Sequence, residues 1–345
     1  MKKLPSIRFT FLPARTGVLA AVLALTGCGK QEIQAQPTRV AVPPAPAAAP
    51  ATPAVPTLPP PPKGDYVENF DTTYNNITVQ RDGTRVELRA RSRRGEFYES
   101  VVDVADPTKL ILQYSRTVYA AAFFQPEPKR ALIIGLGGAG IHRLFAQAYP
   151  DSILQTVELD PMVLALCQSR LEFKPTAKTP VAIMDGRMFV KRDTNKYDWI
   201  LLDAFRGGYV PAHLKTEEFL RECAARLNDH GVFINNLHEG TELFYADIKT
   251  MQKVFSQVVL FNPPDSGNVM AFGVTYQTPV ITDPAKWPDP EVVGKRLFAS
   301  VDLAAIKTEH IPRPKEAAAA QVITDDFNPA ELLNIIKTNN EAKGR

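Results

Sequence analysis

Residues 131–160 read ALIIGLGGAGIHRLFAQAYPDSILQTVELD, and this stretch decides the fold. It begins with an apolar run and continues with three glycines in the spacing GxGxxG, namely Gly135, Gly137 and Gly140. A segment of helical character follows, and a second apolar run ends at Glu158. This order of features, a strand, a glycine turn, a helix, a second strand and an acid, predicts a βαβ unit. The turn of such a unit lies against a ligand.

The chemistry of this unit favours a nucleoside. Glycines let the backbone pass close to a ligand, and the helix that follows offers free N–H groups. A carboxylate at the end of the second strand, here Glu158, can accept hydrogen bonds from both ribose hydroxyls. We therefore predict that the glycine turn and Glu158 bind an adenine nucleoside.

The pattern of strands and helices extends over residues 130–281. Predicted strands and helices alternate there, which indicates a doubly wound α/β sheet. The last two strands, at 258–261 and 269–275, have only a short loop between them. Such a terminal hairpin is typical of nucleoside-dependent transferases rather than of dinucleotide dehydrogenases. Residues 64–129 alternate apolar and polar residues and predict a small antiparallel β domain, and 282–345 form a C-terminal extension.

The N-terminus has the features of an export signal. Basic residues precede a short apolar stretch that ends in Leu-Thr-Gly-Cys, so residues 1–27 are predicted to be a lipoprotein signal peptide with Cys28 as the acylated residue. The alternative is an ordinary secretory signal with an incidental cysteine. The proline- and alanine-rich segment 28–63 then predicts an extended tether. Together these features predict a lipid anchor in the bacterial cell envelope, on the periplasmic face, with the outer membrane favoured because Gly29 follows Cys28.

Composition excludes some classes of partner. A formal net charge of +3 over 345 residues and the lack of a basic block argue against nucleic acid as a partner. The two cysteines other than Cys28, Cys167 and Cys223, lie in apolar helical patterns and predict buried thiols. No spacing of metal ligands is present, so we expect no metal.

Polar residues follow the later strands as well. Asp185 and Gly186 follow the third predicted strand, Asp203 the fourth and His238 the fifth. Since the carboxyl ends of parallel strands meet at one edge of a sheet, these residues are expected in one site. Each acid taken alone is equally well explained as a helix cap or a solvated residue. His238 is a candidate second base, the alternative being a hydrogen-bonded loop histidine.

Six segments together form a recognisable set, namely ALIIGLGGAG, VELDP, MDGRMFV, YDWILLDAF, VPAHLKTEEF and ITDDFNP. They resemble the spermidine synthase (polyamine aminopropyltransferase) family, and more narrowly its bacterial spermidine-synthase-like branch. The resemblance covers about residues 65–328. It implies a class I AdoMet-methyltransferase-like (Rossmann-like) sheet preceded by a small antiparallel β domain. It also implies transfer of an aminopropyl group from decarboxylated S-adenosylmethionine, as co-substrate, to a diamine.

The resemblance assigns roles to the strand-end acids. Glu158 would hold the ribose hydroxyls, and Asp185 would hold the adenine amino group. Asp203 would orient and deprotonate the attacking amine. We further expect a small-molecule substrate, and a homodimer is one option for the assembly.

The chain departs from the family pattern at three places. The family has an acid inside the glycine turn where this chain has Gly138, and an acid where this chain has Arg206. The family's Tyr-Gln-Glu or Tyr-His-Glu signature is read here as Tyr119-Ala120-Ala121. Tyr119 and Arg206 are therefore the candidate substrate residues.

These departures leave alternatives open. An arginine beside the amine site would repel a polyamine. The pocket would then suit S-adenosylmethionine itself, with methyl transfer as the reaction and Arg206 facing an anionic acceptor or the donor's carboxylate. A hypothesis of another class is a non-catalytic, lipid-anchored envelope protein that uses the fold to bind a small molecule or a protein. The export signal favours the second hypothesis, and the intact glycine turn and acids favour a transferase.

Overall fold

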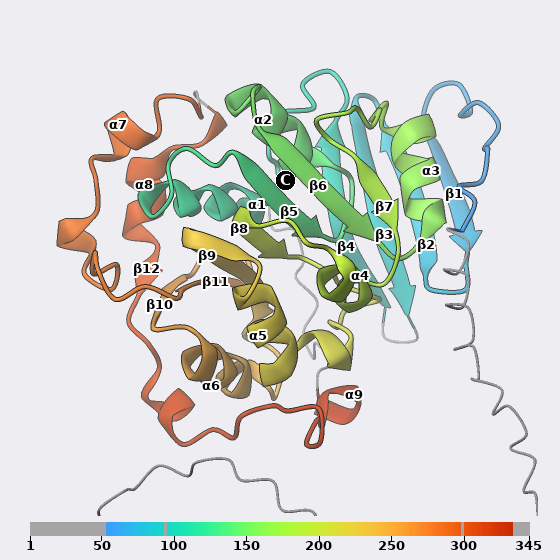
Figure 1. The fold of residues 1–345 in the computed structure, drawn as a ribbon. Coiled ribbons are helices and arrows are strands. Elements are labelled where there is room, and N and C mark those ends of the chain that lie inside the picture. The colour runs from blue at the N-terminus through green and yellow to red at the C-terminus, as the bar shows by residue number, and fades with distance from the viewer. Residues whose placement is uncertain (1–52, 93–94, 298–299, 334–345) are drawn as a thin grey trace, which may run out of the picture. The chain divides into compact units, whose positions relative to one another are not determined.

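The computed structural model describes residues 53–92, 95–297 and 300–333 (Figure 1). The predicted signal peptide at 1–27, the predicted acylation site Cys28 and the first part of the predicted tether lie outside these residues. No helix in the described part of the chain combines the length and the apolar character that a membrane crossing needs.

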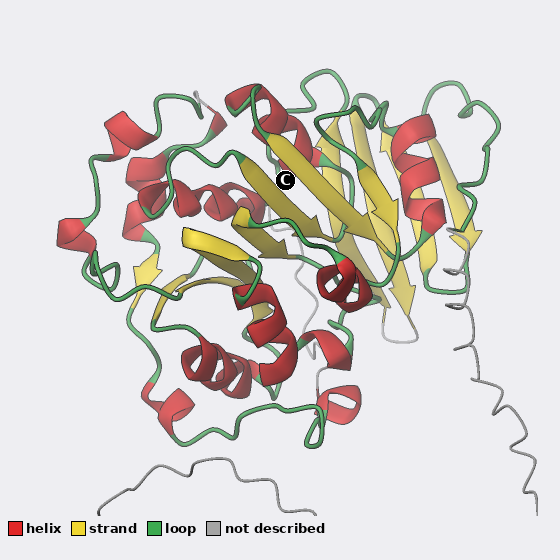
Figure 2. Ribbon diagram, viewed as in Figure 1, coloured by secondary structure: helices red, strands yellow, loops and turns green. Residues whose placement is uncertain are grey.

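Four antiparallel strands form the N-terminal sheet (Figure 2). They lie in chain order and are β1 (Tyr66–Asp71), β2 (Asn76–Asp82), β3 (Arg85–Ser92) and β4 (Gly95–Asp103). Alternate residues of a strand share a face, and Val79 and Leu88 are accordingly buried on one face of this sheet. That face packs against Val163 and Leu166 of helix α3 (Pro161–Arg170). The predicted antiparallel β domain is confirmed.

The second sheet has eight strands in the order β12-β10-β11-β9-β8-β5-β6-β7. Its central strands, from β7 to β9, run parallel, whereas β11 and β10 form an antiparallel hairpin at one side. The strands are β5 (Arg130–Ile134), β6 (Ile153–Glu158), β7 (Val181–Ile183), β8 (Tyr197–Leu202), β9 (Leu227–His238), β10 (Gln257–Phe261), β11 (Asn268–Val274) and β12 (His310–Ile311). The chain order reverses direction between β5 and β8, which is where ligands bind in sheets of this kind. The predicted Rossmann-like sheet with a terminal hairpin is confirmed.

Helices cover both faces of this sheet. Ile133 of β5 packs with α2 and with the 3₁₀ helix Val118–Phe123, whereas its neighbours Leu132 and Ile134 pack with α4, α5 and α6. Figure 1 shows α5 and α6 on the opposite side of the sheet from α1 and α2. The helices are α1 (Gln113–Thr117), α2 (Gly140–Ala148), α3 (Pro161–Arg170), α4 (Gly186–Arg192), α5 (Glu217–Ala224) and α6 (Phe244–Val254).

The C-terminal extension packs against the main sheet and contributes to its core. Its elements are α7 (Pro290–Val293), α8 (Leu303–Thr308), β12 and α9 (Ala330–Leu333). Strand β12 pairs with β10, and Leu303 and Ile306 of α8 are buried in the core. The carboxylate of Asp325 accepts two hydrogen bonds of 2.7 Å from the guanidinium of Arg187 on α4. The extension therefore adds a strand, a core helix and an anchored loop.

The last residues of the predicted tether pack on the N-terminal domain. Val55 and Leu58 lie against the cluster formed by β2, β3 and α3. The guanidinium of Arg170 donates to the carbonyl of Pro59 at 2.8 Å and to the carboxylate of Glu68 at 2.7 Å. Arg170 thus joins the proline-rich segment, strand β1 and helix α3 through one buried side chain.

We expect Arg170→Ala to lower the free energy of unfolding by about 3 kcal/mol, because it removes one partner of a buried ion pair. The Arg170 side chain is 1% exposed and that of Glu68 is 23% exposed. The matched control is Lys178→Ala, since Lys178 pairs with Asp151 and the two side chains are 56% and 94% exposed. That change should cost less than about 1 kcal/mol. Equal losses for the two variants in denaturant unfolding would contradict the role given to Arg170.

Candidate active site

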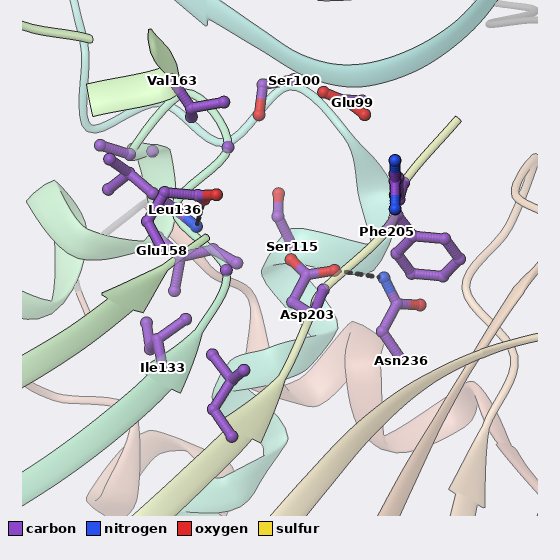
Figure 3. Close-up of a pocket in the computed structure, with 18 of the residues that line it drawn as sticks. Glu99, Ser100, Ser115, Ile133, Leu136, Glu158, Val163, Asp203, Phe205 and Asn236 are labelled. Atoms are coloured by element: carbon purple, nitrogen blue, oxygen red, sulfur yellow. Dashed lines mark hydrogen bonds between the residues drawn. The ribbon is translucent and has the colours of Figure 1, made fainter. Parts of the chain in front are cut away.

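A cavity of about 180 Å³ lies between strand β4 of the N-terminal sheet and the carboxyl ends of β5, β6 and β8 (Figure 3). The glycine turn after β5 forms one part of its wall. The predicted site residues that line it are Gly135, Gly137, Gly140, Glu158, Asp185, Gly186, Asp203, Arg206 and His238. The sheet edge therefore brings together all the predicted nucleoside, base and acceptor residues apart from Tyr119.

The glycine turn is pressed against the end of β8. Gly135 has a φ of +110°, and a Cβ at this position would lie 2.1 Å from the carbonyl oxygen of Asp203. Gly137 also has a positive φ, of +51°. Only glycine adopts such φ values without strain, so the turn needs these residues for its shape. Helix α2 begins at Gly140, directly after the turn.

Glu158 ends strand β6 and holds the turn in place. One carboxylate oxygen accepts from the N–H of Leu136 in the turn, and the other accepts from the N–H of Asp160, both at 2.9 Å. Burial raises the pKa of Glu158. Each carboxylate oxygen can accept a further hydrogen bond, so ribose hydroxyls can bind without displacing the backbone donors.

Asp185 caps helix α4 and contacts a second loop. Its carboxylate accepts from the N–H of Met188 at 2.9 Å and forms a 2.7 Å hydrogen bond with Nε2 of His213. Desolvation raises its pKa, but the hydrogen bonds from His213 and Met188 outweigh this and leave the pKa below its ordinary value. Asp185 thus combines the capping role with a place in the cavity wall.

Asp203 follows strand β8 and has two side-chain donors. Nδ2 of Asn236 donates to Oδ1 at 2.8 Å, and the hydroxyl of Tyr114 lies 3.4 Å from Oδ2. Figure 3 shows the bond between Asp203 and Asn236 at the base of the cavity. Burial raises the pKa of Asp203, so this carboxylate is a stronger base than one in water.

His238 ends strand β9 beside the same cavity. Its Nδ1 accepts a hydrogen bond of 3.0 Å from the N–H of Gly240. This bond fixes the plane of the ring against the loop that follows β9. The predicted role of His238 as a second base stays a prediction.

Tyr119 is not a residue of this cavity, which corrects its prediction as a substrate contact. Its side chain is fully buried in the core, its hydroxyl donates to the carbonyl of Ile141 at 2.8 Å, and its ring packs edge-on against Trp199. The tyrosine that reaches the site is Tyr114, five residues earlier in the chain, on helix α1.

Strand β4 adds Glu99 and Ser100, which the sequence analysis did not identify. Both line the cavity, and Figure 3 shows them across it from Asp203. The carboxylate of Glu99 accepts from Nδ2 of Asn75 at 2.9 Å. Burial, together with the charges of Glu158 and Asp160, raises the pKa of Glu99 to about 7, against the lowering effect of Asn75.

The departures from the family pattern have structural reasons. The hydroxyl of Ser100 accepts from the N–H of Gly138 at 2.6 Å, and a Cβ at Gly138 would lie 2.8 Å from the Cβ of Ser100. Strand β4 therefore takes the space that an acid in the turn would need. Arg206 lines the cavity, but its Nε donates to the carbonyl of Tyr74 in the loop between β1 and β2.

The described residues contain no group of three or more His, Cys, Asp and Glu side chains placed to hold a metal ion. Cys167 and Cys223 are free thiols buried in the core. The Sγ of Cys167 lies 2.9 Å from the carbonyl of Gly137, so this thiol also supports the glycine turn.

The fold and the site define a doubly wound α/β protein with acids at the carboxyl ends of β6, β7 and β8. Residues 113–272 match the family model described as the spermine/spermidine synthase domain. A polyamine aminopropyltransferase of Vibrio vulnificus is 33% identical over 271 residues, which cover 75% of this chain and 88% of that protein. The chain belongs to the spermine/spermidine synthase (polyamine aminopropyltransferase) family.

Other relatives agree with this assignment. A polyamine aminopropyltransferase of Chromobacterium violaceum is 29% identical over 207 residues, 60% of this chain and 78% of that protein. Among solved structures, a probable spermidine synthase from Corynebacterium glutamicum superposes with a TM-score of 0.59 at 22% identity, over 77% of this chain and 97% of that one. A spermidine synthase solved with the transition-state analogue AdoDATO gives a TM-score of 0.52 at 19% identity, over 67% of this chain and 88% of that one. These two likenesses confirm the fold.

We expect Gly135→Ala to destabilise the protein by more than about 3 kcal/mol, since the new methyl group would overlap backbone that cannot move away. The control is Gly83→Ala in the turn between β2 and β3, where φ is +58° and nothing lies within 4 Å of the new Cβ. In that variant only the left-handed backbone conformation is unfavourable, so the free energy of unfolding should fall by about 1 kcal/mol. Similar unfolding free energies for the two variants would refute the close approach of the turn to β8.

Proposed function

We propose that this chain is an aminopropyltransferase that uses decarboxylated S-adenosylmethionine as donor and an amine as acceptor. The observation that carries the proposal is the position of Asp203, a buried carboxylate in the same cavity as the glycine turn and Glu158. Family membership supports the reaction type, because a polyamine aminopropyltransferase matches this chain at 33% identity over 271 residues.

In the proposed complex the nucleoside lies along the carboxyl ends of β5, β6 and β7. The remaining lone pairs of Glu158 accept hydrogen bonds from the ribose hydroxyls. The carboxylate of Asp185 accepts a hydrogen bond from the amino group of adenine. The turn from Gly135 to Gly137 lies beneath the sulfonium, since its two glycines let the backbone approach a ligand closely. These contacts place the donor's reactive carbon toward Asp203.

The transfer itself is a single displacement at carbon. The acceptor nitrogen forms a bond to the aminopropyl carbon, the bond from that carbon to sulfur breaks, and the electron pair stays on sulfur as neutral methylthioadenosine. The nitrogen gives up one proton, which Asp203 accepts. Because burial raises the pKa of Asp203, its carboxylate accepts this proton more readily than a solvated one would. The hydrogen bonds from Asn236 and Tyr114 hold the carboxylate in a fixed orientation.

The charge of the cavity favours the decarboxylated donor. Five carboxylates line it, against two Lys or Arg side chains; the acids are Glu99, Glu158, Asp160, Asp185 and Asp203, and the bases are Lys109 and Arg206. A donor that carries its own carboxylate would meet this excess of negative charge. Methyl transfer from S-adenosylmethionine, with Arg206 as the partner of the donor's carboxylate, is the second candidate, because Arg206 also lines the cavity.

The direct test is to incubate the full chain with each donor and 1,4-diaminobutane and to identify the products by mass spectrometry. Aminopropyl transfer gives methylthioadenosine and an amine extended by one aminopropyl group. A methylated amine formed from S-adenosylmethionine would favour the second candidate. Turnover of neither donor, with no binding of either donor or of methylthioadenosine by calorimetry, would refute both and favour a non-catalytic role.

We expect Asp203→Asn to lower kcat by about 10²–10⁴-fold with little change in the affinity for methylthioadenosine, because only proton acceptance is lost. Glu158→Gln should instead weaken methylthioadenosine binding by about tenfold, through the loss of a charge-assisted bond to the ribose. Steady-state kinetics and calorimetry on the two variants separate these effects. If Asp203→Asn keeps the kcat of the wild type, another group must be the base. His238 is then the next candidate.

We also propose that a lipid on Cys28 holds the domain at the periplasmic face of the cell envelope. Support comes from the basic, apolar and Leu-Thr-Gly-Cys segments in that order. Labelled palmitate should be incorporated into the wild type and not into Cys28→Ala, and the wild type should fractionate with membranes. Equal labelling of the two would contradict the anchor.

A further inference from the structure

The proposed reaction leaves two acids of the cavity without a role, Glu99 and Asp160, and Asp160 already caps helix α3. Glu99 lies on β4, in the domain that packs over the glycine turn, and not at a strand end of the main sheet. Its hydrogen-bond donors are Nδ2 of Asn75 and the backbone N–H of Gly207. Among the residues that the structure describes, no Lys, Arg or His nitrogen forms an ion pair with it.

A β-bulge directs Glu99 into the cavity. In the pairing of β3 with β4, Leu88 is opposite Ser100 and the next residue, Arg89, is opposite Tyr98, so Glu99 is the extra residue on β4. Neighbouring residues of a regular strand point to opposite faces. The bulge breaks this alternation at Glu99, and Glu99 and Ser100 both line the cavity.

The same two residues connect the bulge with the glycine turn. Ser100 fills the space beside Gly138 and accepts its N–H, so the turn has no room for an acidic side chain. The charge of Glu158 acts on Glu99 from the ribose side of the cavity. The charge of Glu99 in turn acts on Tyr114, whose hydroxyl lies beside Asp203. The carboxylate of Glu99 therefore lies within electrostatic reach of Glu158 and of Tyr114, the residue whose hydroxyl is 3.4 Å from Asp203.

We propose that Glu99 binds the primary alkylammonium group of an amine ligand, in place of an acid in the glycine turn. The inference rests on the proposed function for the identity of the ligand. A buried carboxylate without a cationic partner is costly, and a bound ammonium offsets that cost by an ion pair with hydrogen bonds. Both the aminopropyl chain of the donor and the amine acceptor carry such a group.

The test compares the full-length wild type with Glu99→Gln by calorimetry. The ligands are decarboxylated S-adenosylmethionine, methylthioadenosine and 1,4-diaminobutane. The matched control is Glu96→Gln on the same strand, since Glu96 pairs with Arg89 and does not line the cavity. Glutamine has the shape of glutamate and can still accept from Asn75, so thermal unfolding of Glu99→Gln should match that of the wild type.

If Glu99 holds the donor's ammonium group, Glu99→Gln weakens binding of the decarboxylated donor by about 10–100-fold, as expected for a lost charged hydrogen bond. Binding of methylthioadenosine, which has no amine on its side chain, stays unchanged. If Glu99 holds the acceptor instead, the loss appears with 1,4-diaminobutane and not with the donor. Glu96→Gln leaves all three affinities unchanged in either case.

The outcomes separate this inference from the proposed function. If Glu99→Gln binds the donor and the diamine with wild-type affinity, the role of Glu99 is overturned. The proposed transferase function is not affected by that result. Binding of 1,4-diaminobutane that depends on Glu99, in a chain that binds neither nucleoside, would support the ammonium site and refute the transferase. A wild type that binds neither the donor nor the diamine overturns both.

Discussion

The contact between Gly135 and the backbone of Asp203 is the constraint on which the site depends. It brings the turn after β5 so close to the end of β8 that a single methyl group would overlap the carbonyl oxygen. Leu136, the next residue, donates its N–H to Glu158 and so joins the turn to β6 as well. The proposed ribose acid, Glu158, and the proposed base, Asp203, therefore have positions fixed by one piece of backbone, as the proposed in-line displacement requires.

The N-terminal domain adds a charged side chain to a cavity whose other wall is formed by the strand ends of the main sheet. From the sequence, Gly138 and Arg206 indicated a site poor in groups that hold an amine. The structure adds Glu99 from the bulge of β4, and it ties Arg206 to the carbonyl of Tyr74. The balance of charged side chains around the cavity is consequently anionic. Since like charges across a small cavity cost free energy, an anionic balance selects for a cationic ligand.

The sequence predicted the parts of the molecule that follow periodic or local rules. Strand β6, the glycine turn and the acids after each parallel strand were predicted because apolar runs and their ends are visible in one dimension. Glu99 was missed because a bulge depends on the register of β4 with β3 and leaves no mark in the alternation of residues. Tyr119 was predicted to contact substrate because it was matched to the tyrosine of the family signature, whereas in the structure Tyr119 enters the core and Tyr114 reaches the site. Strand β12 was missed because its two residues form a strand only by pairing with β10.

The terminal hairpin also takes part in the chemistry of the site. Asn268 at the start of β11 donates from Nδ2 to Oδ1 of Asn236 at 2.8 Å, and its own Oδ1 accepts from the hydroxyl of Ser266 at 2.8 Å. With its oxygen engaged in this way, Asn236 presents its Nδ2 group to Asp203. Every bond of this series therefore donates toward the carboxylate, which stabilises the ionised form of Asp203 against its burial. The orientation of Asn236 toward the proposed base thus depends on β9 and β11, two neighbouring antiparallel strands that place no acid in the cavity.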